Sequence, residues 1–221
     1  MSAERWGLAV GVDTGELWYM PMRHKRGGNL APEHVMAWAK VNLTRANQPK
    51  VGANLIYDYD FLEQEGVKVE GQVIDVQLAE PLIDENRLSY SLEELAMSYL
   101  GEGKVDQELY EWSAKSYGGK PTRESQAVNI WRCPVQLVGP YAESDVDLPL
   151  RLWEKQAPIL EQQRLTELFQ MESDLMPMVL ARRRRGGRVT VKAAEAFEGM
   201  AGGRRTRPPK ALAEKHCGSP Q

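Results

Sequence analysis

At 221 residues, the chain is long enough for one domain with an ordinary core and an additional segment. It has 42% hydrophobic and 27% charged residues, and no apolar run reaches the roughly 20 residues that cross a bilayer, which excludes a membrane-spanning protein. The two cysteines lack metal-ligand spacing and are too few for a disulfide framework, so we expect a cytoplasmic protein.

The formal net charge of −3 hides an uneven distribution. Residues 182–221 carry 11 Lys/Arg against three Glu, a formal charge of +8, which leaves −11 for residues 1–181. An acidic body does not favour a protein that holds duplex DNA by bulk charge. It is compatible with a nuclease whose carboxylates bind metal ions.

The first half of the chain alternates strands and helices. Apolar runs at residues 6–12 and 17–22 flank Asp13-Thr-Gly-Glu16, which predicts a β-hairpin. Pro32 suits the first turn of a helix, and the apolar run that begins at Val51 predicts a strand ending near Asn54.

The next segment returns to the sheet and continues in helices. A helix from Tyr57 is expected to stop at Gly66, and residues 67–74 to form a strand. Asp75 opens another helix, where capping is the favoured reading of this residue. Ser91 and Glu94 have the spacing of a capping box at the start of a helix that ends before Gly101.

The second half of the chain is predicted to be mostly helical. A helix from Tyr141 should bend around Asp145 because of the ring of Pro149, and a second helix should begin at Ala157. Residues 196–221 have too little apolar surface to form a core, and we expect them to be a disordered basic tail. The order of elements gives an α/β fold with a mixed central sheet flanked by helices.

Two motifs carry the candidate chemistry. Asn54-Leu-Ile-Tyr-Asp58 places an acid just after a strand, and Tyr141-Ala-Glu-Ser-Asp145 places a phenol and an acid one helical turn apart on one face. Two divalent ions held by hard oxygen ligands can activate water and neutralise a scissile phosphate. Either motif alone is weak, but together and in this order they resemble the 3'-5' exonuclease domain of family A DNA polymerases, especially the phage-type ones.

The resemblance implies an RNase H-like 3'-5' exonuclease fold and a two-metal site with Mg²⁺ or Mn²⁺. It implies Asp58 as a ligand of the outer metal, Asp145 as a ligand of the inner metal, and Tyr141 as a hydrogen-bond partner of the attacking water. Asn54 and Tyr57 are candidate nucleic-acid contacts, with ordering of the junction and packing as the alternatives. The implied substrate is the 3' end of single-stranded DNA in a bacterial or phage-infected cell, with no membrane partner.

The chain departs from the family pattern at both ends. The family's first strand, which carries an Asp-x-Glu pair, would precede Leu8 and is not found, so we expect a first strand to be missing and activity to be impaired. We divide the chain into an exonuclease domain at 1–156, a helical connection at 157–195 that resembles the start of a polymerase domain, and the tail. The missing strand or a polymerase could belong to a separate chain.

The remaining candidates have weaker support. Arg183 and Arg184 predict either a phosphate-contacting patch or a solvated helix end. Asp147 fits capping or a solvated face better than metal binding, and His24 and His34 fit ordinary surface residues. The alternative function is a non-catalytic nucleic-acid-binding or interaction module that uses the same cleft without cutting.

Overall fold

The computed structural model describes residues 6–188, 190–192 and 195, so the tail predicted at 196–221 lies outside the described residues. Contacts divide the chain into Met1–Ala181 and Arg182–Gln221, and the fold described below is that of the first part. No helix within the described residues is both long and apolar enough to span a membrane.

The first two strands form the predicted hairpin. β1 (Gly7–Gly11) pairs antiparallel with β2 (Leu17–Pro21), with Gly7 opposite Pro21. The amide of Val12 donates to the carbonyl of Glu16 at 3.1 Å, which closes the turn. Asp13 and Glu16 are exposed turn residues, as their spacing predicted.

The second pair of strands is parallel and carries the first half of the candidate site. β3 (Lys50–Gly52) pairs with β4 (Val73–Asp75), and the helix α2 (Leu55–Gln64) follows β3 directly. One mixed sheet was expected, but the described residues form two separate two-stranded sheets. Among the described strands, neither β1 nor β2 is hydrogen-bonded to β3 or β4, so the two pairs are not joined into one sheet.

Helices make up the rest of the described chain. The predicted helix over residues 91–100 is confirmed, since the hydroxyl of Ser91 accepts from the amide of Glu94 and Gly101 has a φ of 75°. This helix is α4 (Leu92–Leu100). The other helical elements besides α2 are α1 (Pro32–Asn42), α3 (Val76–Ile83), α5 (Gln107–Tyr117), α6 (Arg123–Gln126), the 3-10 helix η1 (Ala127–Arg132), α7 (Val135–Gln162) and α8 (Thr166–Arg185).

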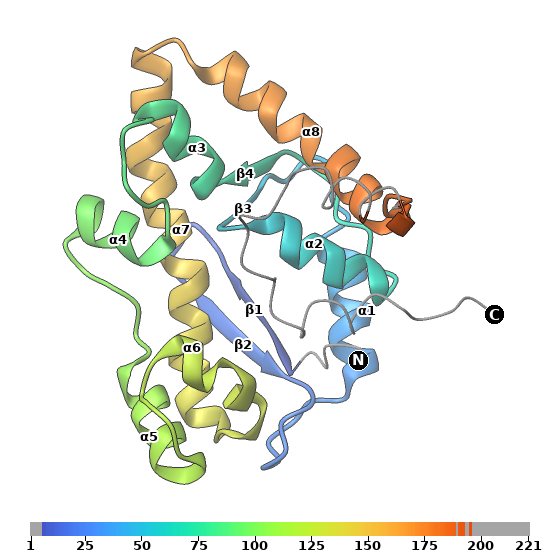
Figure 1. Cartoon of the computed structure of the whole chain (residues 1–221), viewed down its shortest axis with the longest axis vertical. Helices are drawn as coiled ribbons and strands as arrows, with labels where there is room; N and C mark the ends of the chain where they lie inside the picture. Colours follow the sequence, from blue (N-terminus) through green and yellow to red (C-terminus); the bar gives the residue numbers. More distant parts are fainter. Residues whose placement is uncertain (1–5, 189, 193–194, 196–221) are drawn as a thin grey trace. The chain divides into compact units, whose positions relative to one another are not determined.

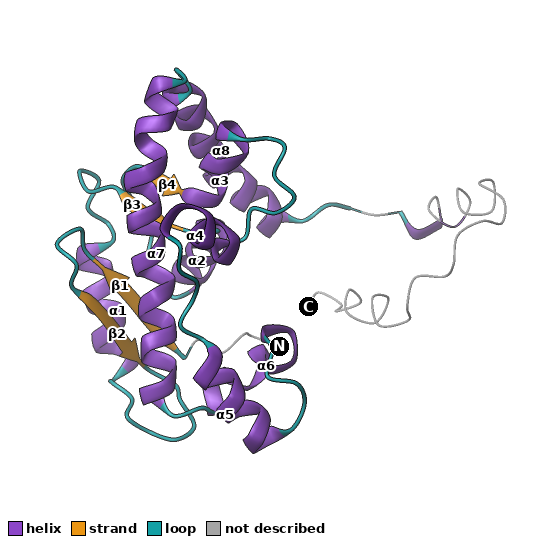
Figure 2. Ribbon diagram, turned by 90° about the vertical axis from the view of Figure 1, so that its left-hand side faces the viewer, coloured by secondary structure: helices purple, strands orange, loops and turns teal. Residues whose placement is uncertain are grey.

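The helix α7 connects the two sheets. It contacts β1, β2 and β3 as well as α3, α4 and α5, and Figures 1 and 2 show β1 and β2 lying beside it. Leu148 and Leu152 on α7 pack with Val76 and Leu95 in the core. Because both sheets rest on one helix, residues on α7 can meet residues that follow β3.

The prediction of a second helix beginning at Ala157 is wrong. α7 runs without interruption from Val135 to Gln162 and includes Pro140, Pro149 and Pro158. Each proline removes one backbone donor, but burial of the apolar face of α7 against both sheets and three helices outweighs that loss. The domain division between residues 156 and 157 stays a prediction, although a continuous helix crosses it.

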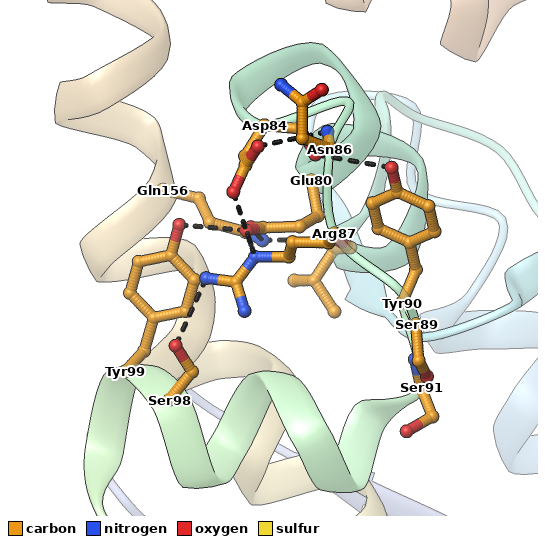
Figure 3. A network of polar contacts seen from close by, with 11 residues as sticks. Glu80, Asp84, Asn86, Arg87, Ser89, Tyr90, Ser91, Ser98, Tyr99 and Gln156 are labelled. Atoms are coloured by element: carbon orange, nitrogen blue, oxygen red, sulfur yellow. Dashed lines mark hydrogen bonds and ion pairs between the residues drawn. The ribbon is translucent and has the colours of Figure 1, made fainter.

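A buried polar network joins α3, α4 and α7 (Figure 3). The carboxylate of Glu80, which is fully buried, lies 2.5 Å from Nε of Arg87. It also accepts from the hydroxyl of Tyr99 at 3.1 Å and from Nε2 of Gln156 at 2.8 Å. Three neighbouring helical segments are therefore tied to one buried charge.

Candidate active site

Asp58 lies in the first turn of α2, immediately after β3. The chain enters this helix through Asn54, which has a φ of 59° and a ψ of 42°. Asparagine tolerates this left-handed conformation better than most residues, so Asn54 allows the sharp change from strand to helix. Its side chain makes no capping hydrogen bond, and its contribution here is to the backbone path that positions Asp58.

Asp75 holds the same junction from the neighbouring strand. Its carboxylate accepts from the amides of Leu55 at 2.7 Å and Asn54 at 3.1 Å, as well as from Gln77 at 2.9 Å. One buried side chain therefore caps α3 and also orders the start of α2, which lies 20 residues earlier in the sequence. The predicted capping role is confirmed, and the added contact to α2 is a finding of the tertiary structure.

We expect Asp75→Ala to lower the free energy of unfolding by about 2 kcal/mol, because three backbone donors lose their acceptor. Burial raises the pKa of Asp75, which means that the charged carboxylate is destabilised by the loss of its water. Removal of this charge therefore recovers a part of the lost stability. Urea denaturation measures the change. Asp84→Ala is the control, since Asp84 accepts from one backbone amide but is 46% exposed. Equal effects of the two substitutions would contradict the role of Asp75.

Tyr141 and Asp145 lie four residues apart on α7. The ring of Tyr141 packs against the core cluster that contains Tyr110, with the two ring centroids 6.2 Å apart. Burial, followed by the nearby carboxylate of Asp145, raises the pKa of Tyr141 well above its usual range. The phenol therefore stays protonated beside Asp145, and its interaction with the hydroxyl of Tyr110 also raises its pKa.

The charges of Asp58 and Asp145 interact, which links the two sequence motifs. Desolvation by the surrounding protein, followed by the carboxylates of Asp75 and then Asp145, raises the pKa of Asp58 to about 7. More than a third of the Asp58 surface is exposed, so solvent screens a part of this effect. Asp58 and Asp145, which are 87 residues apart in the sequence, thus lie within range of each other's charge.

The structure adds Lys104, which the sequence motifs did not identify. Its Nζ lies 2.5 Å from Oδ1 of Asp145 and 5.8 Å from the centre of the Tyr141 ring. Nearby, Asp106 has a raised pKa because of its burial and the neighbouring charge of Glu93, an effect that Lys104 opposes. A single lysine in the loop between α4 and α5 carries no sequence signal that would reveal this pairing.

Carboxylates are suitable ligands for Mg²⁺ or Mn²⁺, so Asp58 and Asp145 stay the predicted ligands of such a cation. Asp75 uses both of its carboxylate oxygens to accept from three backbone amides, which gives it a structural role at this junction. Within residues 6–188, 190–192 and 195, no group of three or more His, Cys, Asp or Glu side chains has the arrangement of a metal site.

The structure also gives the surroundings of the other sequence candidates. Tyr57 is 48% exposed, and its ring meets Phe61 edge-on at 4.4 Å. His24 is buried, with Nε2 lying 2.6 Å from the hydroxyl of Tyr19, so the expectation that it lies on the surface is wrong. Asp147, whose side chain is 29% exposed, pairs with Arg151 on the same helix.

The candidate basic patch lies at the end of α8. Arg183 and Arg184 are exposed in the last turn of this helix and belong to Arg182–Gln221. Their cationic side chains complement the negative end of the helix dipole. A contact of either residue with nucleic acid stays a prediction.

Residues 12–161 match the family model described as 3'-5' exonuclease. The chain is 35% identical over 194 residues to a DNA-directed DNA polymerase of Pseudomonas phage M6, a match that covers 87% of this chain and 28% of the phage protein. It is 37% identical over 185 residues to the DNA polymerase DpoZ of Salmonella phage PMBT28, covering 83% and 28%. DNA polymerase I of Pseudomonas aeruginosa is 28% identical over 190 residues, covering 82% and 19%. The chain thus spans less than a third of the length of these curated relatives.

Proposed function

Because the chain belongs to the 3'-5' exonuclease family of family A DNA polymerases, we propose that it removes nucleotides from the 3' end of single-stranded DNA in a reaction that requires a divalent metal ion. The observation that carries the proposal is the electrostatic coupling between Asp58 and Asp145, with Tyr141 on the same face of α7 as Asp145. These are the acids and the phenol of the two sequence motifs.

Each side chain has a defined part in this proposal. A bound Mg²⁺ or Mn²⁺ would polarise the scissile phosphate and increase the acidity of a water molecule. Asp58 offers an exposed carboxylate to such a cation, and Asp145 offers a second one from α7. Tyr141 stays protonated and can donate a hydrogen bond to the attacking water. Tyr57 presents an aromatic ring on which a terminal base can stack.

We further propose that the described residues alone would cut slowly. One of the two carboxylates is paired with Lys104, and the described residues contain no group of three or more acidic, His or Cys side chains that could hold a metal ion. A strand with an Asp-x-Glu pair, supplied from elsewhere in a longer polypeptide or by a separate polymerase chain, would complete the set. The setting that we propose is the cytoplasm of a bacterial or phage-infected cell.

A second candidate function is single-strand binding without cleavage, which the ion pair between Lys104 and Asp145 favours because it occupies a proposed ligand. Both functions use the same DNA end, so binding alone does not distinguish them. The distinction depends on whether the bound strand is shortened.

The test uses single-stranded DNA labelled at its 5' end and incubated with the chain and Mn²⁺ or Mg²⁺. We expect stepwise shortening from the 3' end with metal and none after chelation by EDTA, since the chemistry depends on the cation. A DNA with a blocked 3' end controls for the direction of cleavage. Binding of intact DNA without shortening in either metal would support the second candidate, and shortening in EDTA would contradict the metal requirement.

A further inference from the structure

We propose that Lys104 is a built-in counter-ion of Asp145, which a divalent metal ion must displace, so that this ammonium group sets the metal affinity of the site. The inference rests on the proposed function, because it takes Asp145 as a metal ligand. It goes further in assigning a regulatory part to a residue outside both sequence motifs.

The first observation is the ion pair itself. The ammonium group of Lys104 lies 2.5 Å from Oδ1 of Asp145, and the two side chains are 12% and 30% exposed. A lysine that is 12% exposed has given up most of its contact with water, and the carboxylate is its compensation. The same nitrogen lies 5.8 Å from the centre of the Tyr141 ring, where a cation is attracted to the aromatic face.

The second observation is that the backbone delivering Lys104 is fastened on two sides. The amide of Lys104 donates to Oε2 of Glu93 at 2.8 Å, which ties the loop to α4. The amide of Val105 donates to Ser144 Oγ at 3.4 Å, and Glu102 forms an ion pair with Arg151, which ties the loop to α7. The loop therefore holds Lys104 over Asp145, unlike a surface lysine on a free segment.

Gly103 is part of this arrangement. A Cβ built at Gly103 would overlap the carboxylate of Glu93, so a larger residue there would require this carboxylate to shift and would disturb its hydrogen bond with the amide of Lys104. Glycine at this position permits the close approach that places the next residue, Lys104, at the site.

The third observation is the balance of charge around the pair. The charge of Asp145 interacts with those of Asp58 and Asp106. Asp106 also interacts with Lys104, and Glu93 accepts from the amide of Lys104. Lys104 thus lies near the carboxylates of Asp145, Asp106 and Glu93, and such an acidic surrounding also attracts a divalent cation.

Other oxygen atoms near Lys104 can accept from its ammonium group when this group leaves Asp145. Lys104 lines a hollow of about 360 Å³, together with Asp106, Glu108 and Gln136. These side chains offer carboxylate and amide oxygens to an ammonium group that leaves Asp145. Displacement therefore exchanges one set of oxygen partners for another instead of leaving a buried charge unpaired, which would be costly.

The test measures Mn²⁺ binding to the full chain by isothermal titration calorimetry, without DNA. We expect Lys104→Met, which keeps the aliphatic stem and removes the charge, to bind Mn²⁺ about tenfold more tightly than the parent, since its carboxylate no longer has to be released from an ion pair. Lys104→Arg retains the competing charge and should bind like the parent. Lys68→Met removes one lysine charge at a site where the side chain is 77% exposed, and it should also bind like the parent.

Asp145→Asn separates the possible failures. If the parent binds Mn²⁺ and loses this binding in Asp145→Asn, but Lys104→Met binds no more tightly, the counter-ion role is overturned while the proposed metal site stands. If neither the parent nor Lys104→Met binds Mn²⁺, the metal site and the counter-ion role both fail. Melting in EDTA gives a second readout: Lys104→Met should melt below the parent, and Mn²⁺ should restore its melting temperature more than it raises that of the parent.

Discussion

Asp145→Asn is expected to lose about a hundredfold or more of the metal-dependent cleavage of single-stranded DNA, because a metal ion contributes several kcal/mol to stabilising the transition state. Asparagine has nearly the shape of aspartate but carries no charge, so the substitution preserves packing on α7. The measurement is the rate of shortening of a 5'-labelled strand in saturating Mn²⁺. Circular dichroism and thermal melting show whether the variant keeps its fold.

Asp147→Asn is the matched control for this prediction. Asp147 lies on the same helix two residues further along, and its carboxylate contacts Arg151 at 3.2 Å. The same chemical change at this position should leave the cleavage rate within about twofold, because Asp147 is not one of the proposed metal ligands and its carboxylate already pairs with Arg151. A rate for Asp145→Asn equal to that of Asp147→Asn would remove Asp145 from the proposed metal site.

Arg87→Met is expected to have the largest effect on stability, lowering the free energy of unfolding by about 3 kcal/mol. Arg87 is the charged partner of Glu80, whose side chain is fully buried. Loss of the guanidinium would leave a buried carboxylate with only neutral donors, Tyr99 and Gln156. Urea denaturation at neutral pH measures the change.

The double variant Glu80→Gln/Arg87→Met tests the cause. It removes the buried charge together with its partner, while an amide at position 80 can still accept from Tyr99. We expect the double variant to recover at least half of the stability lost in Arg87→Met, since an uncompensated charge is the main penalty. A double variant as unstable as the single one would assign the loss to the packing of Arg87 on Tyr99, whose ring centre lies 5.3 Å from the guanidinium carbon.

The candidate site was partly accessible from the sequence. Tyr141 and Asp145 are one helical turn apart, so a helix alone puts them on one face. Asp58 was predicted from its place after a strand, and this place is confirmed. Lys104 was not predicted, because its pairing with Asp145 depends on how the loop between α4 and α5 is fastened to α7. No spacing within the sequence encodes that contact.

The secondary structure, like the site, was predictable where it depends on residues close in the sequence. The hairpin of β1 and β2 and the helix α4 were predicted because their turn and cap residues act on neighbours in the sequence. The single mixed sheet was not found, and three prolines failed to interrupt α7. Both outcomes depend on parts of the chain that are distant in the sequence. The sheet depends on which strands can pair, and the continuity of α7 depends on the sheets and helices against which it packs.

The amino-acid sequence by itself determined the membership of the exonuclease family, the local elements and the two motifs, because each of these depends on residue types at short separations. Only the tertiary structure decided that Asp75 orders the helix carrying Asp58, that Glu80 is buried with Arg87, and that Lys104 reaches Asp145. These three contacts join segments whose proximity is produced by packing against neighbouring helices and strands. Their energies depend on burial and charge, which arise when the chain has folded.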